Sequence, residues 1–403
     1  MIQLLLSILY LIAALLAAPQ PAQAQSADAC LRLAHEPLNR DNEAALRQQL
    51  DSWVETCRQA SATNPADTRL KIGLSKALWH AQGRPASLPP LREAIAQGDT
   101  NAMLELFNDY NSFDGHLDRP DLIPREEAVR ALRRAAELGN TDAIWRLATI
   151  SSRGGPLKHD MAEARKWGAI ALTHPPKNAN VDVGTLKVVV GHWLSLSDDA
   201  AERARGIALL EALPQRGDAQ AYLAEAIRGN DPVRARALLE ASLRSYPGHA
   251  LAPLCDMLIK GEGGPKDEKR AVALLQKAPY DAQHPKALLG ELMLEGRLVP
   301  RDAAAAIKLM GPWSQWDYDT RLKLLHAVTA NPTVTLSYPE HYLTTVMADA
   351  EVGEPGAMEA LIALKLSNHV QFADKAGGCA AAERAVKAGH AAAAPYLASC
   401  GAK

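Results

Sequence analysis

Aromatic side chains are scarce in this sequence of 403 residues. They make up 5% of the chain, with only three Phe, whereas hydrophobic residues as a whole reach 48%. The core must therefore be built from alanine and branched aliphatic side chains, which suits closely packed helices better than a β-sandwich. A chain of this hydrophobicity, with 22% charged residues, is not expected to be disordered. Its length allows several ordinary domains or one long repeat array.

An excess of charge of either sign is also missing. Lys and Arg total 44 and Asp and Glu total 46, which gives a formal net charge of -2. Nucleic-acid binding in general requires an excess of basic charge for the phosphate contacts. We therefore expect no nucleic-acid partner.

Motifs that carry catalytic chemistry are absent from the sequence. It has no G-x-S-x-G, H-E-x-x-H, P-loop, G-x-G-x-x-G or S-x-x-K pattern. The 12 His form no i, i+4 pair, and no CxxC or Cys/His spacing of a zinc site occurs. We therefore predict that the protein is not an enzyme and has no catalytic residue, cofactor or metal site.

The N-terminus has the pattern of a secretory signal peptide. Residues 4–18 form an apolar run, too short for a membrane-spanning helix, and Ala22 and Ala24 form an A-x-A site. Cleavage is predicted after Ala24. The first three residues carry no Lys or Arg, so an uncleaved N-terminal anchor is the alternative interpretation. No later stretch reaches 18 apolar residues, so we expect no stable membrane insertion after cleavage.

Five cysteines fit an oxidising compartment. Cys379 and Cys400 lie about equally far from a predicted turn at Gly389, so they would face each other at the open end of a helical hairpin. Closing that loop contributes about 3 kcal/mol in the chain-entropy model. The second predicted pair, with a less symmetric spacing about its turn, is Cys30 with Cys57. The remaining residue, Cys255, lies on a helical apolar pattern and is expected to be a buried free thiol.

The sequence repeats itself at a fixed interval. Residues 252–274, APLCDMLIKGEGGPKDEKRAVAL, align without a gap with residues 287–309, ALLGELMLEGRLVPRDAAAAIKL, at an offset of 35. An earlier copy begins at Ala143 as AIWRLATISSRGGPLKHDMAEARKW. A second signature, a helical pattern that ends at Gly before the next helix, recurs at 92–106, 133–147, 214–223, 349–361 and 385–397. Self-similarity at this period is typical of helical solenoids.

Each unit is predicted to contain a helix, a tight turn with Gly, a second helix and a longer loop with Gly, Pro and Asp. Gly suits the end of a helix because that position commonly needs a positive φ. Asp160, Asp267 and Asp302 are expected to cap the helix that follows the longer loop. A single hairpin of this kind cannot bury its apolar face, so neighbouring hairpins must stack.

These features resemble the Sel-one-like repeat family, relatives of tetratricopeptide repeats. The segment from Glu126 to Trp167, with EAVRALRRAAELGNTDAIWRLA followed by GGPLKHDMAEARKW, is the most similar, and residues 247–312 supply two further copies. The resemblance implies an all-α fold, a right-handed α/α superhelical solenoid of helix-turn-helix repeats of about 35–36 residues. It also implies a scaffold or adaptor that holds a protein partner on its concave face.

We predict five segments from these patterns. They are a signal peptide (1–24), an N-terminal helical cap (25–66), a repeat array (67–312), an irregular interrupting segment (313–345), and C-terminal repeats with a cap (346–403). Within the array, residues 173–184 form an inserted loop between two helices. The combination of an export signal, this repeat and a high alanine content favours the periplasm of a Gram-negative bacterium, or secretion from it.

An aromatic cluster in the irregular segment is the candidate binding surface. Trp313, Trp316 and Tyr318 lie within six residues in a broken repeat. They could line a groove for a partner peptide or for sugar rings, or they could fill the gap that an irregular unit leaves. The first hypothesis is a non-enzymatic periplasmic scaffold, with a role in cell-envelope assembly or secretion. The alternative is a factor that binds carbohydrate or peptidoglycan. A hydrolase, as ascribed to some cysteine-rich relatives, is disfavoured by the missing S-x-x-K motif and by the lack of a cysteine pair in each repeat.

Overall fold

The computed structural model describes residues 21–111, 122–154, 156–177, 181–279, 283–313 and 318–401. Over these ranges the chain forms helices, turns and loops without a β-strand, which confirms the all-α prediction. The chain divides into two compact units, residues 1–143 and 144–403. Most of the predicted signal peptide, residues 1–20, lies outside the described residues, so cleavage after Ala24 stays a prediction. Among the described helices none is long and apolar enough to cross a membrane.

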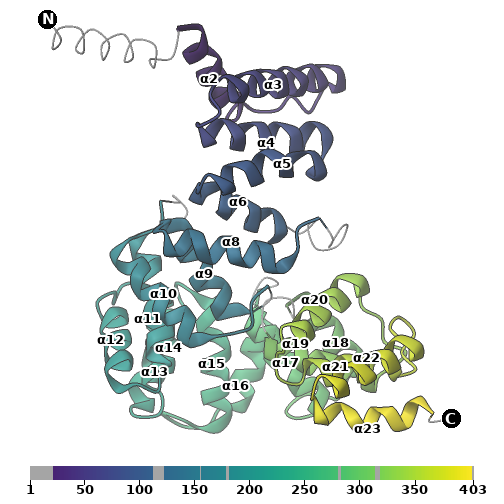
Figure 1. Cartoon of the computed structure of the whole chain (residues 1–403). Coiled ribbons are helices and arrows are strands. Elements are labelled where there is room, and N and C mark those ends of the chain that lie inside the picture. Colours follow the sequence, from purple (N-terminus) through teal and green to yellow (C-terminus); the bar gives the residue numbers. More distant parts are fainter. Residues whose placement is uncertain are drawn as a thin grey trace, which may run out of the picture. The chain divides into compact units, whose positions relative to one another are not determined.

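Unit 1 is a stack of antiparallel helices. They are α2 (Pro21–Leu33), α3 (Glu43–Thr63), α4 (Thr68–Gln82), α5 (Arg84–Ala96), α6 (Thr100–Asn111) and α8 (Arg125–Glu137). Each helix packs on its neighbour in the sequence (Figure 1). The disulfide between Cys30 and Cys57 joins α2 to α3 at the start of the described chain, which is the pairing expected from the sequence.

Unit 2 continues the same alternation over more helices. Their bounds are α9 (Thr141–Arg153, which crosses from unit 1), α10 (Met161–Thr173), α11 (Val183–Ser195), α12 (Ala200–Glu211), α13 (Gly217–Ile227), α14 (Pro232–Ser242), α15 (Pro247–Lys260), α16 (Glu268–Gln276), α17 (Gln283–Glu295), α18 (Ala303–Met310), α19 (Tyr318–Ala330), α20 (Pro339–Glu351), α21 (Ala357–Leu366), α22 (Lys375–Lys387) and α23 (Ala394–Leu397). Short 3-10 turns, η1 (Gly311–Trp313), η2 (Ala391–Ala393) and η3 (Ala398–Cys400), follow α18, α22 and α23. The loop between α10 and α11 is the predicted insertion.

Helices of unit 2 pair most extensively in hairpins that begin at every second helix from α11. The pairs are α11 with α12, α13 with α14, α15 with α16, and α17 with α18. Small side chains permit this approach, since the Cys255 Sγ of α15 lies 3.5 Å from the backbone carbonyl of Ala271 in α16. The sequence pattern grouped the two helices that flank a tight turn into one unit. In the structure, the closely packed pairs α15–α16 and α17–α18 instead span the longer loops. We call α11, α13, α15 and α17 the first helices.

The predicted capping residues begin the helices that follow the longer loops. The carboxylate of Asp160 accepts a hydrogen bond from Glu163 N, that of Asp267 from Arg270 N, and that of Asp302 from Ala305 N. Gly139, which follows the end of α8, has a φ of +86° and so adopts the left-handed conformation expected there.

The two remaining cysteine predictions also agree with the structure. A disulfide joins Cys379 in α22 to Cys400 at the end of η3. Cys255 is a buried free thiol in the core of the repeat array. Burial raises the pKa of this thiol to about 12, so it stays protonated at neutral pH.

A hydrogen bond joins two loops of unit 2 that are far apart in the sequence. The buried carboxylate of Glu354, in the turn between α20 and α21, accepts from the backbone N of His159, 2.6 Å away and 195 residues earlier. Its Oε1 also lies 3.0 Å from where a Cβ on Gly154 would stand. We refer to this contact as the clasp.

Candidate binding groove

A groove of about 560 Å³ runs along the first helices of unit 2. Successive first helices contact one another, α11 with α13, α13 with α15, and α15 with α17, so their side chains form a continuous surface. The lining consists of polar side chains with a few small and aliphatic ones. It comprises His192, Tyr222, Glu225, Arg228, His249, Ala252, Pro253, Asp256, His284, Ala287, Leu288, Glu291 and Thr320.

The groove arises from equivalent positions of successive repeats. His249, Pro253 and Asp256 are spaced i, i+4, i+7 along α15, a spacing that places side chains on one face of a helix. His284, Leu288 and Glu291 have the same spacing in α17, each 35 residues later, the offset of the sequence repeat. Stacking of the repeats thus turns one helical face into one lining surface.

Ring contacts link the lining residues of four helices. The rings of His192 and Tyr222 stack with centroids 4.0 Å apart, and the Tyr222 hydroxyl lies 3.1 Å from Nδ1 of His249. Tyr246, which precedes α15, stacks on His249 at 5.0 Å. The rings of His249 and His284 are 6.0 Å apart. We call these five residues the ring row.

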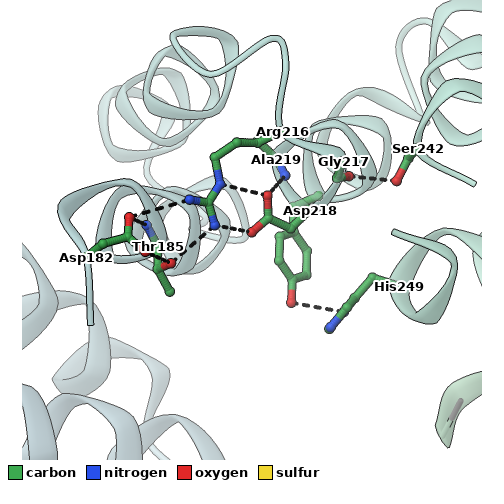
Figure 2. A network of polar contacts seen from close by, with 9 residues as sticks. Asp182, Thr185, Arg216, Gly217, Asp218, Ala219, Ser242 and His249 are labelled. Carbon is green, nitrogen blue, oxygen red and sulfur yellow. Dashed lines mark hydrogen bonds and ion pairs between the residues drawn. The ribbon is translucent and has the colours of Figure 1, made fainter. Parts of the chain in front are cut away.

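A polar network fixes the beginnings of α11 and α13 beside the ring row (Figure 2). Arg216 donates to both carboxylate oxygens of Asp218, at 3.0 and 2.6 Å, and to the Thr185 hydroxyl at 3.2 Å. Its guanidinium also lies 3.5 Å from Asp182. Although burial opposes it, the hydrogen bonds from Arg216 hold the pKa of Asp218 below its ordinary value. The hydroxyl of Ser242 donates to the Gly217 carbonyl at 2.6 Å and ties α14 to this end of α13.

The acidic groups of the lining differ in their partners. Asp256 is paired with Arg228 at 2.6 Å and with Lys260 at 2.8 Å, and Glu291 is paired with Lys323 at 2.7 Å. Glu225 makes no hydrogen bond or ion pair with the described residues. Desolvation, opposed by the charge of Arg228, raises the pKa of Glu225 to about 7 although its side chain is accessible from the groove.

The histidines beside Glu225 are held in their neutral form. Burial lowers the pKa of His192 to about 4, and burial with the neighbouring His284 lowers the pKa of His249. Nδ1 of His192 is buried without a hydrogen-bond partner among the described residues. No group of three or more His, Cys, Asp or Glu within the described ranges is arranged to hold a metal ion. The lining therefore offers neutral rings, hydrogen-bonding groups and one uncompensated carboxylate.

The aromatic cluster expected to bind a partner lies only partly within the described structure. Tyr318 begins α19 and is half-buried, its hydroxyl donates to the Pro355 carbonyl at 2.5 Å, and the Arg321 guanidinium lies 5.6 Å from its ring. Its hydroxyl and one face thus have protein partners, and it is not among the groove-lining residues. Trp316 and the side chain of Trp313 lie outside the described residues, so a role for this cluster stays a prediction.

The groove residues were not predicted from the sequence. No two histidines lie i, i+4 apart, so the spacing within a single helix gives no sign of a shared site. The signal that was available is the offset of 35 between His249 and His284 and between Asp256 and Glu291.

Antiparallel helical hairpins that stack and share one lining surface define a helical repeat protein of the solenoid class. Three segments of the chain, residues 141–172, 249–278 and 287–312, match the model of the Sel1 repeat. Each segment begins with one helix (α9, α15 or α17) and extends into the next. The chain therefore contains Sel1 repeats, as the sequence resemblance predicted. Proteins of this class are generally scaffolds for protein–protein interaction.

Solved structures of similar proteins include two with this repeat. A Sel1 repeat protein from Oxalobacter formigenes shares 18% identity, with 77% of this chain and 89% of that chain covered and a TM-score of 0.40. The protective antigen c5321 of uropathogenic Escherichia coli, which displays an SLR fold, shares 19% identity over 92% and 79%, with a TM-score of 0.42. A circular tandem repeat protein with a novel repeat topology shares 11% identity over 94% and 96%, with a TM-score of 0.17. All three scores lie below 0.5, so the assignment rests on the matched repeats. No curated protein matches the chain.

Proposed function

We propose that the protein is an exported, non-enzymatic scaffold whose groove in unit 2 holds a segment of a protein partner. The observation that carries this proposal is the groove itself. It extends over four successive first helices and presents side chains, such as Glu225 and the exposed His284, that the packing of the repeats does not use. Stacked repeats commonly present a long binding surface of this kind.

Export to the periplasm is the second part of the proposal. The two disulfides lie near the two ends of the described chain, Cys30–Cys57 in α2 and α3 and Cys379–Cys400 in α22 and η3. Structural disulfides persist in oxidising compartments and are rare in the bacterial cytosol. Together with the predicted signal peptide, they support a periplasmic location and a role in the cell envelope or in secretion.

Site-specific photocrosslinking in living cells tests this function. A benzophenone amino acid at position 284 places the probe in the groove, and the same probe at Val233, which is 67% exposed on α14, serves as the control. We expect discrete protein adducts from position 284 and none of these adducts from position 233. The same adducts from both positions, or none from the groove in a folded exported protein, would contradict the proposal. Glycan adducts from a probe at Trp316, with no protein adduct, would instead support the carbohydrate alternative.

A further inference from the structure

Glu225 lies among acidic groups that already have basic partners. In the described structure Arg228 is occupied by Asp256 at 2.6 Å and Glu262 at 2.5 Å, and Lys323 is occupied by Glu291. Glu225 is one turn along α13 from Tyr222, so its carboxylate belongs to the same face as the ring row. A cation that enters the groove therefore finds one carboxylate that is not neutralised by the protein itself.

Three rings of the ring row beside this carboxylate, those of His192, Tyr222 and His249, are uncharged at neutral pH. Burial lowers the pKa of His192 and His249 and raises the pKa of Tyr222, so all three rings are neutral. Neutral aromatic faces attract cations through their quadrupole, most effectively where water is partly excluded. A planar guanidinium can stack on such faces and donate two parallel hydrogen bonds to a carboxylate, which a lysine ammonium cannot do.

We propose that the groove recognises an extended segment of a protein partner through an arginine side chain, whose guanidinium pairs with Glu225 beside the rings of Tyr222 and His249. This inference rests on the proposed function and specifies the chemistry of its ligand. The groove volume of about 560 Å³ lies in the range of sites that enclose small ligands, so it accommodates a few residues of an extended chain rather than a folded domain.

Binding of a guanidinium at this position is coupled to proton release. The cation favours the ionised form of Glu225, so binding removes the proton that this group partly holds near pH 7. The other charged or titratable groups of the lining are Tyr222 on the same helix, Arg228 at its C-cap, His192 on α11, His249 and Asp256 on α15, and His284 and Glu291 on α17. Because ionisation of Glu225 adds attraction for the guanidinium, affinity is expected to increase from pH 6 to pH 8.

The test uses peptides selected by display on the purified protein. Their dissociation constants are measured by fluorescence anisotropy on the wild type, on Glu225→Gln and on Glu211→Gln. The control removes a carboxylate that pairs with Arg234 on the surface of α12 and α14, away from the groove lining. We expect arginine at a fixed position of the selected peptides, an affinity loss of at least about tenfold with Glu225→Gln, and less than about twofold with Glu211→Gln. On the wild-type protein, replacing the peptide's arginine by citrulline is expected to weaken binding as much as Glu225→Gln does. The two changes together are expected to weaken binding no further.

The outcomes separate the ligand chemistry from the function of the groove. A third variant, His284→Trp, places a bulky ring in the groove, and circular dichroism checks that each variant is folded. Peptides that lack an arginine at a fixed position, or that bind Glu225→Gln as tightly as the wild type, overturn the arginine anchor. If His284→Trp still weakens them, the groove remains the binding site. If no peptide is enriched, or if none is affected by any groove variant, the proposed function fails and the anchor with it.

Discussion

The buried ion pair between α19 and α20 provides a quantitative test of how unit 2 is stabilised. Arg321 donates to both carboxylate oxygens of Asp349, at 2.5 and 3.0 Å, and the two side chains are only 5% and 2% exposed. The Tyr342 hydroxyl donates to the Arg321 carbonyl at 3.0 Å, so the pair lies within a packed core. Burial raises the pKa of Asp349 although Arg321 opposes the shift. Keeping this carboxylate ionised in the core therefore costs free energy.

The raised pKa of Asp349 determines how its contribution to the stability of unit 2 changes with pH. Folding favours the protonated carboxyl, so the stability that Asp349 contributes is lost as the pH rises from its unfolded pKa through its folded pKa. At neutral pH the pair is therefore expected to stabilise unit 2 no better than two apolar residues of similar size. Removing one partner is different, because it leaves the buried guanidinium without its carboxylate. We expect Asp349→Ala to cost about 3–5 kcal/mol, and the double variant Arg321→Met with Asp349→Val to lie within about 1 kcal/mol of the wild type.

Urea denaturation measures these differences in the free energy of unfolding. Hydrogen exchange, read on peptides from α19 and α20, measures them locally. The exposed pair of Arg297 and Glu295, with N and O 2.9 Å apart, is the control, and Glu295→Ala should cost less than about 0.5 kcal/mol. A cost of under about 1 kcal/mol for Asp349→Ala would refute the reasoning. So would a double variant as unstable as the single one, because the loss would then come from packing and not from an unpartnered charge.

Three further predictions concern close packing, a cross-link and pH. A Cβ on Gly206 would lie 2.6 Å from the Gly191 carbonyl and against the backbone of α11. Gly206→Ala should therefore destabilise unit 2 by about 3 kcal/mol in urea titrations. The same change at Gly229, which has open space around it, should not destabilise the unit. Replacing Cys379 and Cys400 by Ser should remove about 3 kcal/mol of stability from the C-terminal helices, read by hydrogen exchange of α22. The unfolded chain takes up a proton at His192 near pH 6.5, and the folded chain only near pH 4. The stability of the wild type should therefore decrease as the pH falls from 6.5 to 4, and the decrease should be smaller in His192→Phe.

Each of these has a result that would contradict it. Equal stabilities of Gly206→Ala and Gly229→Ala would mean that α11 and α12 can separate at little cost. Unchanged exchange in α22 after loss of the disulfide would mean that packing alone holds the C-terminal end. A pH dependence identical in the wild type and His192→Phe would assign the acid sensitivity to other groups.

Most of the fold was predictable because the repeat combines several independent local signals. Gly139 and the capping Asp160, Asp267 and Asp302 mark helix ends, and the disulfide between Cys379 and Cys400 followed from their equal distances to a turn. Local chemistry decides each of these helix ends within a few residues. Which neighbouring helices form each closely packed pair did not follow from the pattern, since the same helix order fits either grouping until the packing is known.

The groove could not be predicted to the same extent, because its residues are distant in the sequence. His192 and His249 are 57 residues apart, and only the stacking of α11, α13 and α15 brings them to Tyr222. Trp313 and Tyr318 are close together in the sequence and were predicted to bind a partner, whereas the Tyr318 hydroxyl donates to the Pro355 carbonyl. In a repeat protein, residues one period apart are better candidates for a shared site than residues close together in the chain.

The clasp changes how the stability of unit 2 can be described. In an open array each repeat contacts only its neighbours, so the free energy is a sum of repeat and interface terms and folding can spread from any repeat. The bond from His159 to Glu354 adds a term between repeats 195 residues apart. That term is gained only after every intervening hairpin has formed, since the two loops meet only when the array between them is in place. Closure is therefore a late, high-contact-order step, and a defect in any middle repeat is transmitted to both loops of the clasp.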